Sequence, residues 1–144
     1  MYKNREGYPD PTAGKAIAQF MKDYKKQQEI IWKRQYNIKQ RPKVYVVSPY
    51  TGDIEKNVQA AVTYCRYVIS KEKIPVASHL LYPVMLRDYV PEERELGTMF
   101  GLALLADCDE VWCFGRELSP GMVVEVAEAK KLNKPIRYFD GEVY

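Results

Sequence analysis

Residues 43–54 read Lys43-Val-Tyr-Val-Val-Ser-Pro-Tyr-Thr-Gly-Asp-Ile54, and this run sets the architecture of the 144-residue chain. Its first half is a β-branched and aromatic run that is typical of a buried strand. A turn segment follows, and the Asp53 side chain can cap the helix that begins after it. The helix is indicated by apolar residues that recur every three or four positions, namely Val58, Ala61, Val62, Cys65, Val68 and Ile69.

The same alternation of strand and helix signals continues to residue 139. Residues 74–77 and 110–114 indicate two further strands, Pro91 opens a helix between them, and residues 135–139 form a last strand. Ser119 caps the final helix and Asn133 ends it. We expect the helix from Pro91 to bury the apolar side formed by Leu96, Met99, Phe100, Ala103 and Leu104. This order predicts an α/β, Rossmann-like (flavodoxin-type) three-layer sandwich around a parallel sheet of four to five strands.

An N-terminal arm precedes this domain. Residues 1–42 carry ten Lys or Arg against four acids, whereas residues 43–144 carry twelve against fifteen. We therefore divide the chain into a basic helical arm, 1–42, and an α/β domain, 43–144. Asp10 and Pro11 predict the start of one helix that runs to about Ile38. Its apolar side consists of Ala13, Ile17, Phe20, Met21, Tyr24, Ile31 and Ile38.

Two partners can cover that apolar side. The first is the arm's own domain or a sister subunit, which makes the protein a homo-oligomer, and we favour it because no base-reading motif accompanies the helix. The second is nucleic acid, bound through basic residues of the arm, namely Lys22, Lys25, Lys26, Lys33 and Arg34.

Composition excludes several functional classes. No run approaches the roughly 18 apolar residues of a membrane span, and Met1 to Glu6 open no signal-peptide core, so we expect a cytoplasmic protein without membrane contact. Three cysteines give no disulfide framework, and a single histidine argues against a metal site. Neither a Gly-x-x-x-x-Gly-Lys loop nor a Gly-x-Gly-x-x-Gly motif is present, so we expect no cofactor.

The ligand site is expected beyond the carboxyl ends of the strands, where an open α/β sheet forms its crevice. The helix opened by Ser119-Pro-Gly-Met122 offers backbone amides there, with no side chain on Gly121 to block an anion. Glu125 shares that helix face, one turn further on. This pairing makes sense if an anionic or hydroxyl-rich group rests on the amides while the carboxylate addresses an electrophilic carbon. The alternative is that Glu125 is a solvated helix residue.

Four motifs carry a family resemblance: Ser48-Pro-Tyr50, Ala77-Ser-His-Leu80, Cys108-Asp-Glu-Val-Trp-Cys-Phe-Gly115 and Ser119-Pro-Gly-Met-Val-Val-Glu125. Over about residues 43–139 the chain resembles the uncharacterised bacterial and phage proteins (DUF4406- and DUF7768-like) of the nucleoside 2-deoxyribosyltransferase-like superfamily. The resemblance implies cleavage or exchange of an N-glycosidic bond with Glu125 as nucleophile. An aspartate that assists the leaving base in those enzymes falls at Gly101 here. The terminus Gly141 to Tyr144 is similar to one that reaches a neighbour's site.

The resemblance also assigns roles to other residues. If it holds, we expect Tyr50 to orient the glutamate, and Asp53, Asn57 or His79 to hold sugar hydroxyls or to protonate the base. Independently of the resemblance, the residue chemistry suggests a phosphate site at Arg116 with Ser48, Ser119 and the amides of Gly121 and Met122, which would point to nucleotides rather than nucleosides. Besides Glu125, Tyr50 and His79 as catalytic residues, the ligand-binding set is Ser48, Pro49, Asp53, Asn57, Tyr82, Arg94, Arg116, Ser119, Gly121 and Met122.

Simpler alternatives stand beside these roles. Asp53 is a helix cap, and His79 is a hydrogen-bonded structural residue. A rival function is a non-catalytic protein that binds or sequesters a nucleotide-derived ligand in the same crevice, and the missing acid at Gly101 favours it. A third function is a structural accessory whose arm assembles oligomers.

Overall fold

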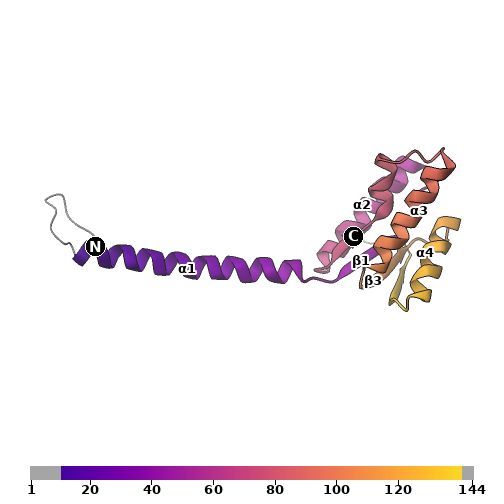
Figure 1. Ribbon diagram of the computed structural model, residues 1–144. Coiled ribbons are helices and arrows are strands. Elements are labelled where there is room, and N and C mark those ends of the chain that lie inside the picture. Colours follow the sequence, from indigo (N-terminus) through magenta and orange to yellow (C-terminus); the bar gives the residue numbers. More distant parts are fainter. Residues whose placement is uncertain (1–10, 141–144) are drawn as a thin grey trace. The chain divides into compact units, whose positions relative to one another are not determined.

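The computed structural model describes residues 11–140, which form two units that meet between Gln40 and Arg41 (Figure 1). The first unit is the helix α1 (Pro11–Lys39), as predicted. None of its residues is buried. The expectation that its apolar side packs on its own domain or on a sister subunit therefore stays a prediction. The proposed cap Asp10 and the segment 141–144 lie outside the described residues.

The second unit is a Rossmann-like α/β domain. Its strands are all parallel and follow the order β2-β1-β3-β4, which is the flavodoxin-type order expected from the sequence. The elements are β1 (Lys43–Val47), α2 (Ile54–Ser70), β2 (Ile74–Val76), the 3-10 turns η1 (Ser78–Leu80) and η2 (Tyr82–Val84), α3 (Pro91–Ala106), β3 (Glu110–Phe114), α4 (Pro120–Lys131) and β4 (Ile136–Phe139).

Both faces of the sheet are covered, so β1 and β3 are apolar at nearly every position. Successive side chains of β1 point to opposite faces of the sheet. Tyr45 and Val47 pack with α3 and α4, whereas Val44 and Val46 pack with α2 and an aromatic cluster. In that cluster Phe114 stacks on Tyr64, with ring centroids 4.5 Å apart. The alternation places every second side chain of β1 toward α4, the helix that carries Glu125.

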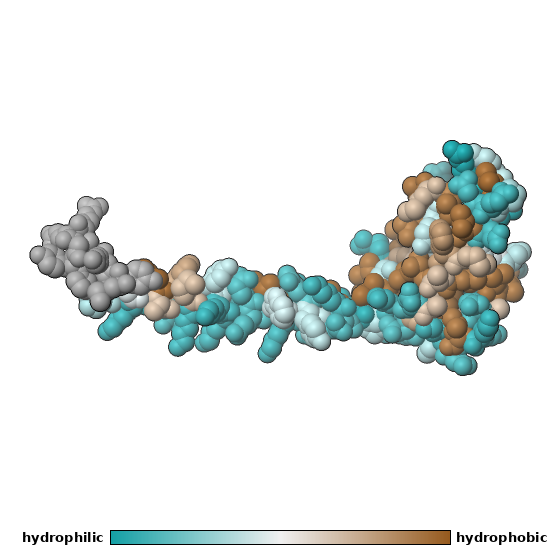
Figure 2. Space-filling model, in the orientation of Figure 1, coloured by the Kyte–Doolittle hydropathy of each residue, from teal (hydrophilic) through white to brown (hydrophobic). Residues whose placement is uncertain are grey.

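The buried side of α3 differs from the expected one. Leu96, Met99 and Phe100 are 45%, 51% and 42% exposed, and Ala103 is exposed too, whereas Gly101 and Leu105 are buried. The reason is that Gly101 lets the helix backbone approach closely: a Cβ there would lie only 3.0 Å from Ser78 Oγ. Of the expected side only Leu104 reaches the core. Apolar residues accordingly appear on the visible face of this unit (Figure 2).

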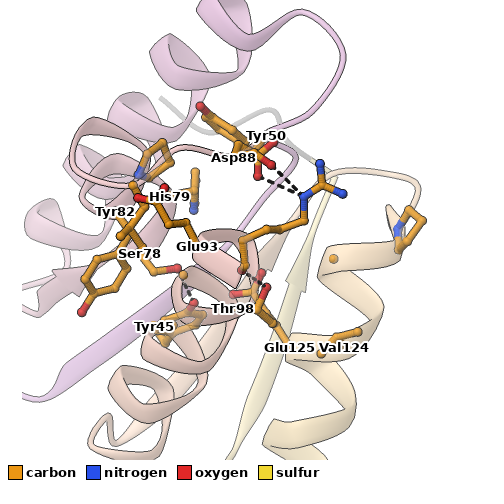
Figure 3. A pocket seen from close by; sticks show the side chains of 17 residues that line it. Tyr45, Tyr50, Ser78, His79, Tyr82, Asp88, Glu93, Thr98, Val124 and Glu125 are labelled. Carbon is orange, nitrogen blue, oxygen red and sulfur yellow. Dashed lines mark hydrogen bonds and ion pairs between the residues drawn. The ribbon is translucent and has the colours of Figure 1, made fainter. Parts of the chain in front are cut away.

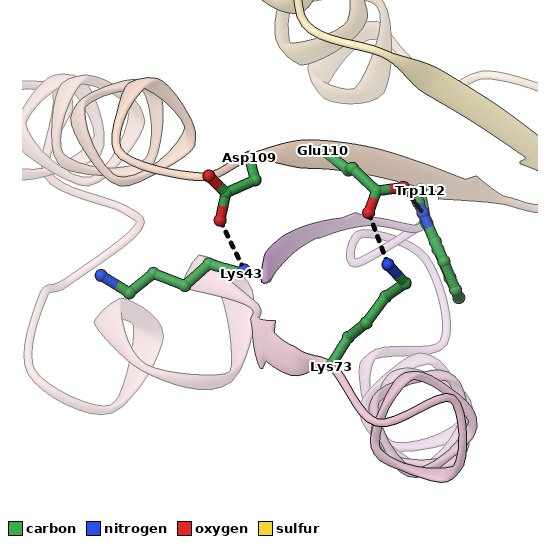
Figure 4. A network of polar contacts seen from close by, with 5 residues as sticks. All are labelled: Lys43, Lys73, Asp109, Glu110 and Trp112. Atoms are coloured by element: carbon green, nitrogen blue, oxygen red, sulfur yellow. Dashed lines mark hydrogen bonds and ion pairs between the residues drawn. The ribbon is translucent and has the colours of Figure 1, made fainter. Parts of the chain in front are cut away.

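The amino ends of the strands are tied by polar contacts (Figure 4). Lys73 Nζ lies 2.8 Å from Glu110 Oε2, and Trp112 Nε1 donates to Glu110 Oε1 at 3.1 Å. Lys73 lowers the pKa of Glu110 by this hydrogen bond. The Asp109 carboxylate accepts from the amide of Lys43 at 2.8 Å. These contacts join β1, β2 and β3 at one edge of the sheet, so the opposite, carboxyl edge is the one available for a ligand.

The described residues include no helix with the length and apolarity that a membrane crossing requires. The three cysteines are free thiols. Cys108 and Cys113 are buried and Cys65 is half-buried.

Candidate active site

A cavity of about 380 Å³ lies at the carboxyl edge of the sheet (Figure 3). Its walls come from β1 and the loop after it, from the η1 and η2 turns after β2, and from α3 and α4. It therefore lies where the strand order reverses, between β1 and β3, and its size suits a small organic ligand. The lining residues are Tyr45, Tyr50, Ser78, His79, Tyr82, Pro83, Leu86, Asp88, Glu93, Arg94, Gly97, Thr98, Gly101, Pro120, Gly121, Val124 and Glu125.

Glu125 presents its carboxyl group to this cavity from the second turn of α4. The residue is half-buried, and its Oε2 atom is enclosed without a hydrogen-bond partner among residues 11–140. Burial raises the pKa of Glu125 to about 7, while a hydrogen bond with Tyr45 acts in the opposite direction. The carboxyl thus exchanges its proton nearer to neutral pH than an ordinary glutamate does, and one oxygen is left for a ligand.

Tyr45 was not singled out from the sequence, because it is part of the strand pattern. Its hydroxyl lies 2.7 Å from Ser78 Oγ. Burial, followed by the charge of Glu125, raises the pKa of Tyr45 well above its usual range, so the phenol keeps its proton and serves as a hydrogen-bond donor. Strand alternation was the available signal, because it places Tyr45 on the same face of β1 as Val47, toward α4.

His79 and Tyr50 line another part of the cavity, as Figure 3 shows. Ser48 Oγ lies 2.8 Å from His79 Nε2, and the rings of Tyr50 and His79 are 6.5 Å apart. Burial lowers the pKa of His79 to about 4, so the imidazole is neutral at pH 7. A neutral ring exchanges hydrogen bonds with a ligand but holds no imidazolium proton to give. Ser48 is buried and is not among the lining residues, so it reaches the cavity only through its contact with His79.

The start of α3 contributes charged groups. Arg94 Nε donates to the backbone oxygen of Asp88 at 3.0 Å and lies 3.5 Å from Asp88 Oδ1. Glu93 Oε1 accepts from the amide of Arg87 at 3.3 Å. Arg94 was expected from the sequence as a ligand-binding residue, and it lines the cavity together with Gly97 and Gly101 of the same helix. Sequence reasoning missed Glu93, because helix-start acids are common for reasons of helix polarity alone, and it missed Asp88, which lies in the loop before α3.

Two expected ligand-binding residues instead shape the loop after β1. The Asp53 side chain accepts from the amide of Lys56 at 3.2 Å and caps α2. The Asn57 side chain donates to the backbone oxygens of Tyr50 and Thr51, at 3.1 and 2.9 Å. Neither lines the cavity. Their structural role is to hold the segment that carries Tyr50.

The expected anion site at the start of α4 is only partly available. Ser119 Oγ accepts the amide of Met122 at 3.4 Å, and Ser119 O accepts that of Val123 at 3.0 Å. The Met122 side chain is buried in the core. Gly121 lines the cavity, but Ser119 and Met122 do not.

Arg116, an expected phosphate contact, and Pro49, an expected ligand-binding residue, also lie outside the cavity lining. Arg116 is exposed. Pro49 lies beside Gly115, where an added Cβ atom would be 3.7 Å from Pro49 Cδ. Tyr82 does line the cavity, and its ring lies 5.4 Å from that of Phe100. Within residues 11–140 no group of three or more His, Cys, Asp or Glu side chains has an arrangement suited to a metal ion.

Comparison with known proteins begins with the family that is described as a domain of unknown function, DUF7768, which matches residues 42–139. This chain belongs to that family. The DUF7768 domain thus spans the whole α/β unit from the start of β1 to the end of β4 and leaves out α1. The match confirms the DUF7768 part of the resemblance. No curated protein matches the sequence of this chain.

The fold of the DUF7768 domain is similar to that of a 2-deoxyribosyltransferase from Bacillus psychrosaccharolyticus, which is described as a biocatalyst for the synthesis of antiviral and antitumoral nucleosides. The two share 16% sequence identity at a TM-score of 0.58. The similarity covers 71% of this chain and 76% of the transferase, and it is a likeness of fold.

Proposed function

We propose that the cavity binds a nucleoside or nucleotide and that Glu125 attacks its sugar, so that the protein cleaves or exchanges an N-glycosidic bond. The observation that carries this proposal is the enclosed, unpartnered Oε2 atom of Glu125 beside a cavity large enough for a small organic ligand. An unpaired carboxylate oxygen in such a place is costly unless a ligand uses it. The likeness of fold to a 2-deoxyribosyltransferase supports the choice of ligand.

The proposed reaction has two steps. The ionised Glu125 forms a bond to the anomeric carbon, the carbon–nitrogen bond breaks, and its electron pair leaves with the base, which takes a proton from water in the open cavity. Water, or a second base, then attacks the same carbon and releases the carboxylate, while the incoming group loses a proton. Water gives the free sugar and a second base gives a new nucleoside.

The neighbouring side chains have supporting roles. Tyr45 is a positioning residue, because its hydroxyl donates to Glu125 and favours the ionised carboxylate. Neutral His79, held by Ser48, exchanges hydrogen bonds with the sugar or the base. The ring of Tyr50 offers a face for a flat base.

A second candidate is a protein that binds the same ligand without turnover. Gly101 favours it, because the superfamily acid that assists the leaving base is absent there, and a Cβ at this position would already approach Ser78 Oγ to 3.0 Å. A side chain at position 101 would therefore require Ser78 to shift.

Chromatography of the full chain with deoxynucleosides, ribonucleosides and their 5′-monophosphates separates the two candidates. Release or exchange of base that disappears in Glu125→Gln and Glu125→Ala supports the enzyme. Glu128→Gln is the matched control, because Glu128 lies on the same helix but not in the cavity lining. Calorimetric binding without release of base in the wild type supports the binding protein, and absence of both binding and release refutes both.

A further inference from the structure

The charged groups that line the cavity are predominantly acidic. Asp88, Glu93 and Glu125 contribute carboxylates, and Arg94 contributes the single cation among the lining residues of the described chain. A ligand that carries a negative charge is therefore repelled by more groups than attract it.

The cation at this site is already engaged. Arg94 Nε donates to the backbone oxygen of Asp88, and the Asp88 carboxylate lies 3.5 Å from the same nitrogen. Both side chains are 63% exposed, so this pair offsets part of the charge of Arg94, and no other Lys or Arg lines the described cavity to balance Glu93 and Glu125. Glu93 Oε1 accepts from the amide of Arg87 at 3.3 Å, and this contact favours a carboxylate position beside the cavity.

Two of the helix-start amides that could bind a phosphate are committed elsewhere. At the start of α4, the amides of Met122 and Val123 donate hydrogen bonds to the side-chain and backbone oxygens of Ser119. Arg116, which the sequence nominated for a phosphate, is not among the lining residues. A phosphate in the cavity would therefore lose its hydration without gaining a full set of protein donors.

We propose that Asp88 and Glu93 are specificity-determining residues that restrict this cavity to nucleosides without a phosphate. The inference rests on the proposed function and narrows its substrate class. Asp88 acts by pairing with Arg94, which weakens the attraction of Arg94 for a phosphate. Glu93, in the first turn of α3, acts by repelling an anionic group in the cavity.

The test compares kcat/KM for base release, and Kd from calorimetry, for deoxyadenosine, adenosine and thymidine with those for their 5′-monophosphates. We expect each nucleoside to be preferred by at least about tenfold at low salt, and the preference to shrink as added salt screens the carboxylates. The double variant Asp88→Asn/Glu93→Gln keeps the side-chain sizes and should lower the preference severalfold. Glu92→Gln is the control, because Glu92 is an exposed neighbour outside the cavity lining and should leave the preference unchanged.

The outcomes separate this inference from the proposed function. Equal or better use of monophosphates, with release that still depends on Glu125, overturns the specificity and leaves the proposed function standing. If the double variant prefers nucleosides over monophosphates as strongly as the wild type does, Asp88 and Glu93 do not determine the specificity. If neither nucleosides nor monophosphates bind or react, both the inference and the proposed function fail.

Discussion

The Tyr45 hydroxyl and Ser78 Oγ lie 2.7 Å apart, and this contact joins β1 to the η1 turn beside the cavity. Tyr45 also hydrogen-bonds Glu125 from α4. Three segments that are far apart in the sequence therefore meet at one phenol. The ionisation of the proposed nucleophile depends on that meeting.

Replacing Tyr45 by Phe removes the donor that favours ionised Glu125. Since the pKa of Glu125 is about 7 with the hydrogen bond present, its loss should raise that pKa further. Base release needs the carboxylate, so it rises with pH through about 7 in the wild type, and we expect the midpoint to move to higher pH in Tyr45→Phe. The pH profile of kcat/KM measures this. Tyr64→Phe, in the opposite core, controls for loss of a phenol, and an unshifted midpoint in Tyr45→Phe contradicts the assignment.

The buried carboxyl of Glu125 should lower stability above neutral pH. Its pKa is about 7 in the folded protein and 4.5 in the unfolded chain, so the stability that the neutral form contributes is complete below about pH 4.5 and is lost as pH rises to about 7. Glu125→Gln avoids this loss and should be more stable than the wild type at pH 8 by about 3 kcal/mol. Urea unfolding at pH 4.5 and pH 8 measures the difference, and equal gains at the two pH values would argue against a buried charge.

Two glycines of α3 should respond oppositely to alanine. A Cβ on Gly101 would lie 3.0 Å from Ser78 Oγ and 3.3 Å from the Tyr45 hydroxyl, so Gly101→Ala must push the pair apart and should cost about 1–3 kcal/mol. Gly97→Ala meets only the flexible Leu86 side chain at 3.4 Å and gains helix propensity, up to about 1 kcal/mol. Thermal unfolding of both variants provides the comparison. Equal effects would mean that Gly101 is not crowded.

The end of α2 carries a correctable strain. Glu72 has φ of 60°, and the amides of Glu72 and Lys73 bond to the oxygens of Ile69 and Val68, which is the pattern of a helix end that favours glycine. We expect Glu72→Gly to stabilise the domain by about 1 kcal/mol and to raise Tm by about 4 °C. Glu72→Ala keeps the Cβ and should give no such gain. A calorimetric scan that finds both variants alike would contradict this reason.

The amino-acid sequence by itself determined the order of strands and helices, the caps at Asp53 and Ser119, and the sheet edge at which a ligand site forms. These features depend on residues close together in the chain, because side-chain periodicity, capping hydrogen bonds and the direction of parallel connections are local. The same local rules brought Glu125 to the correct edge as a candidate.

Only the tertiary structure decided which groups meet there and in what charge state. The apolar side of α3 was assigned to the core from its spacing, yet Gly101 turned a different side inward because it alone permits a close backbone approach. Tyr45, Ser78, Asp88 and Glu93 line one cavity because elements that are distant in the sequence pack together. The burial and the pKa of a side chain depend on atoms that come together from distant parts of the chain, and these contacts cannot be predicted from local sequence patterns.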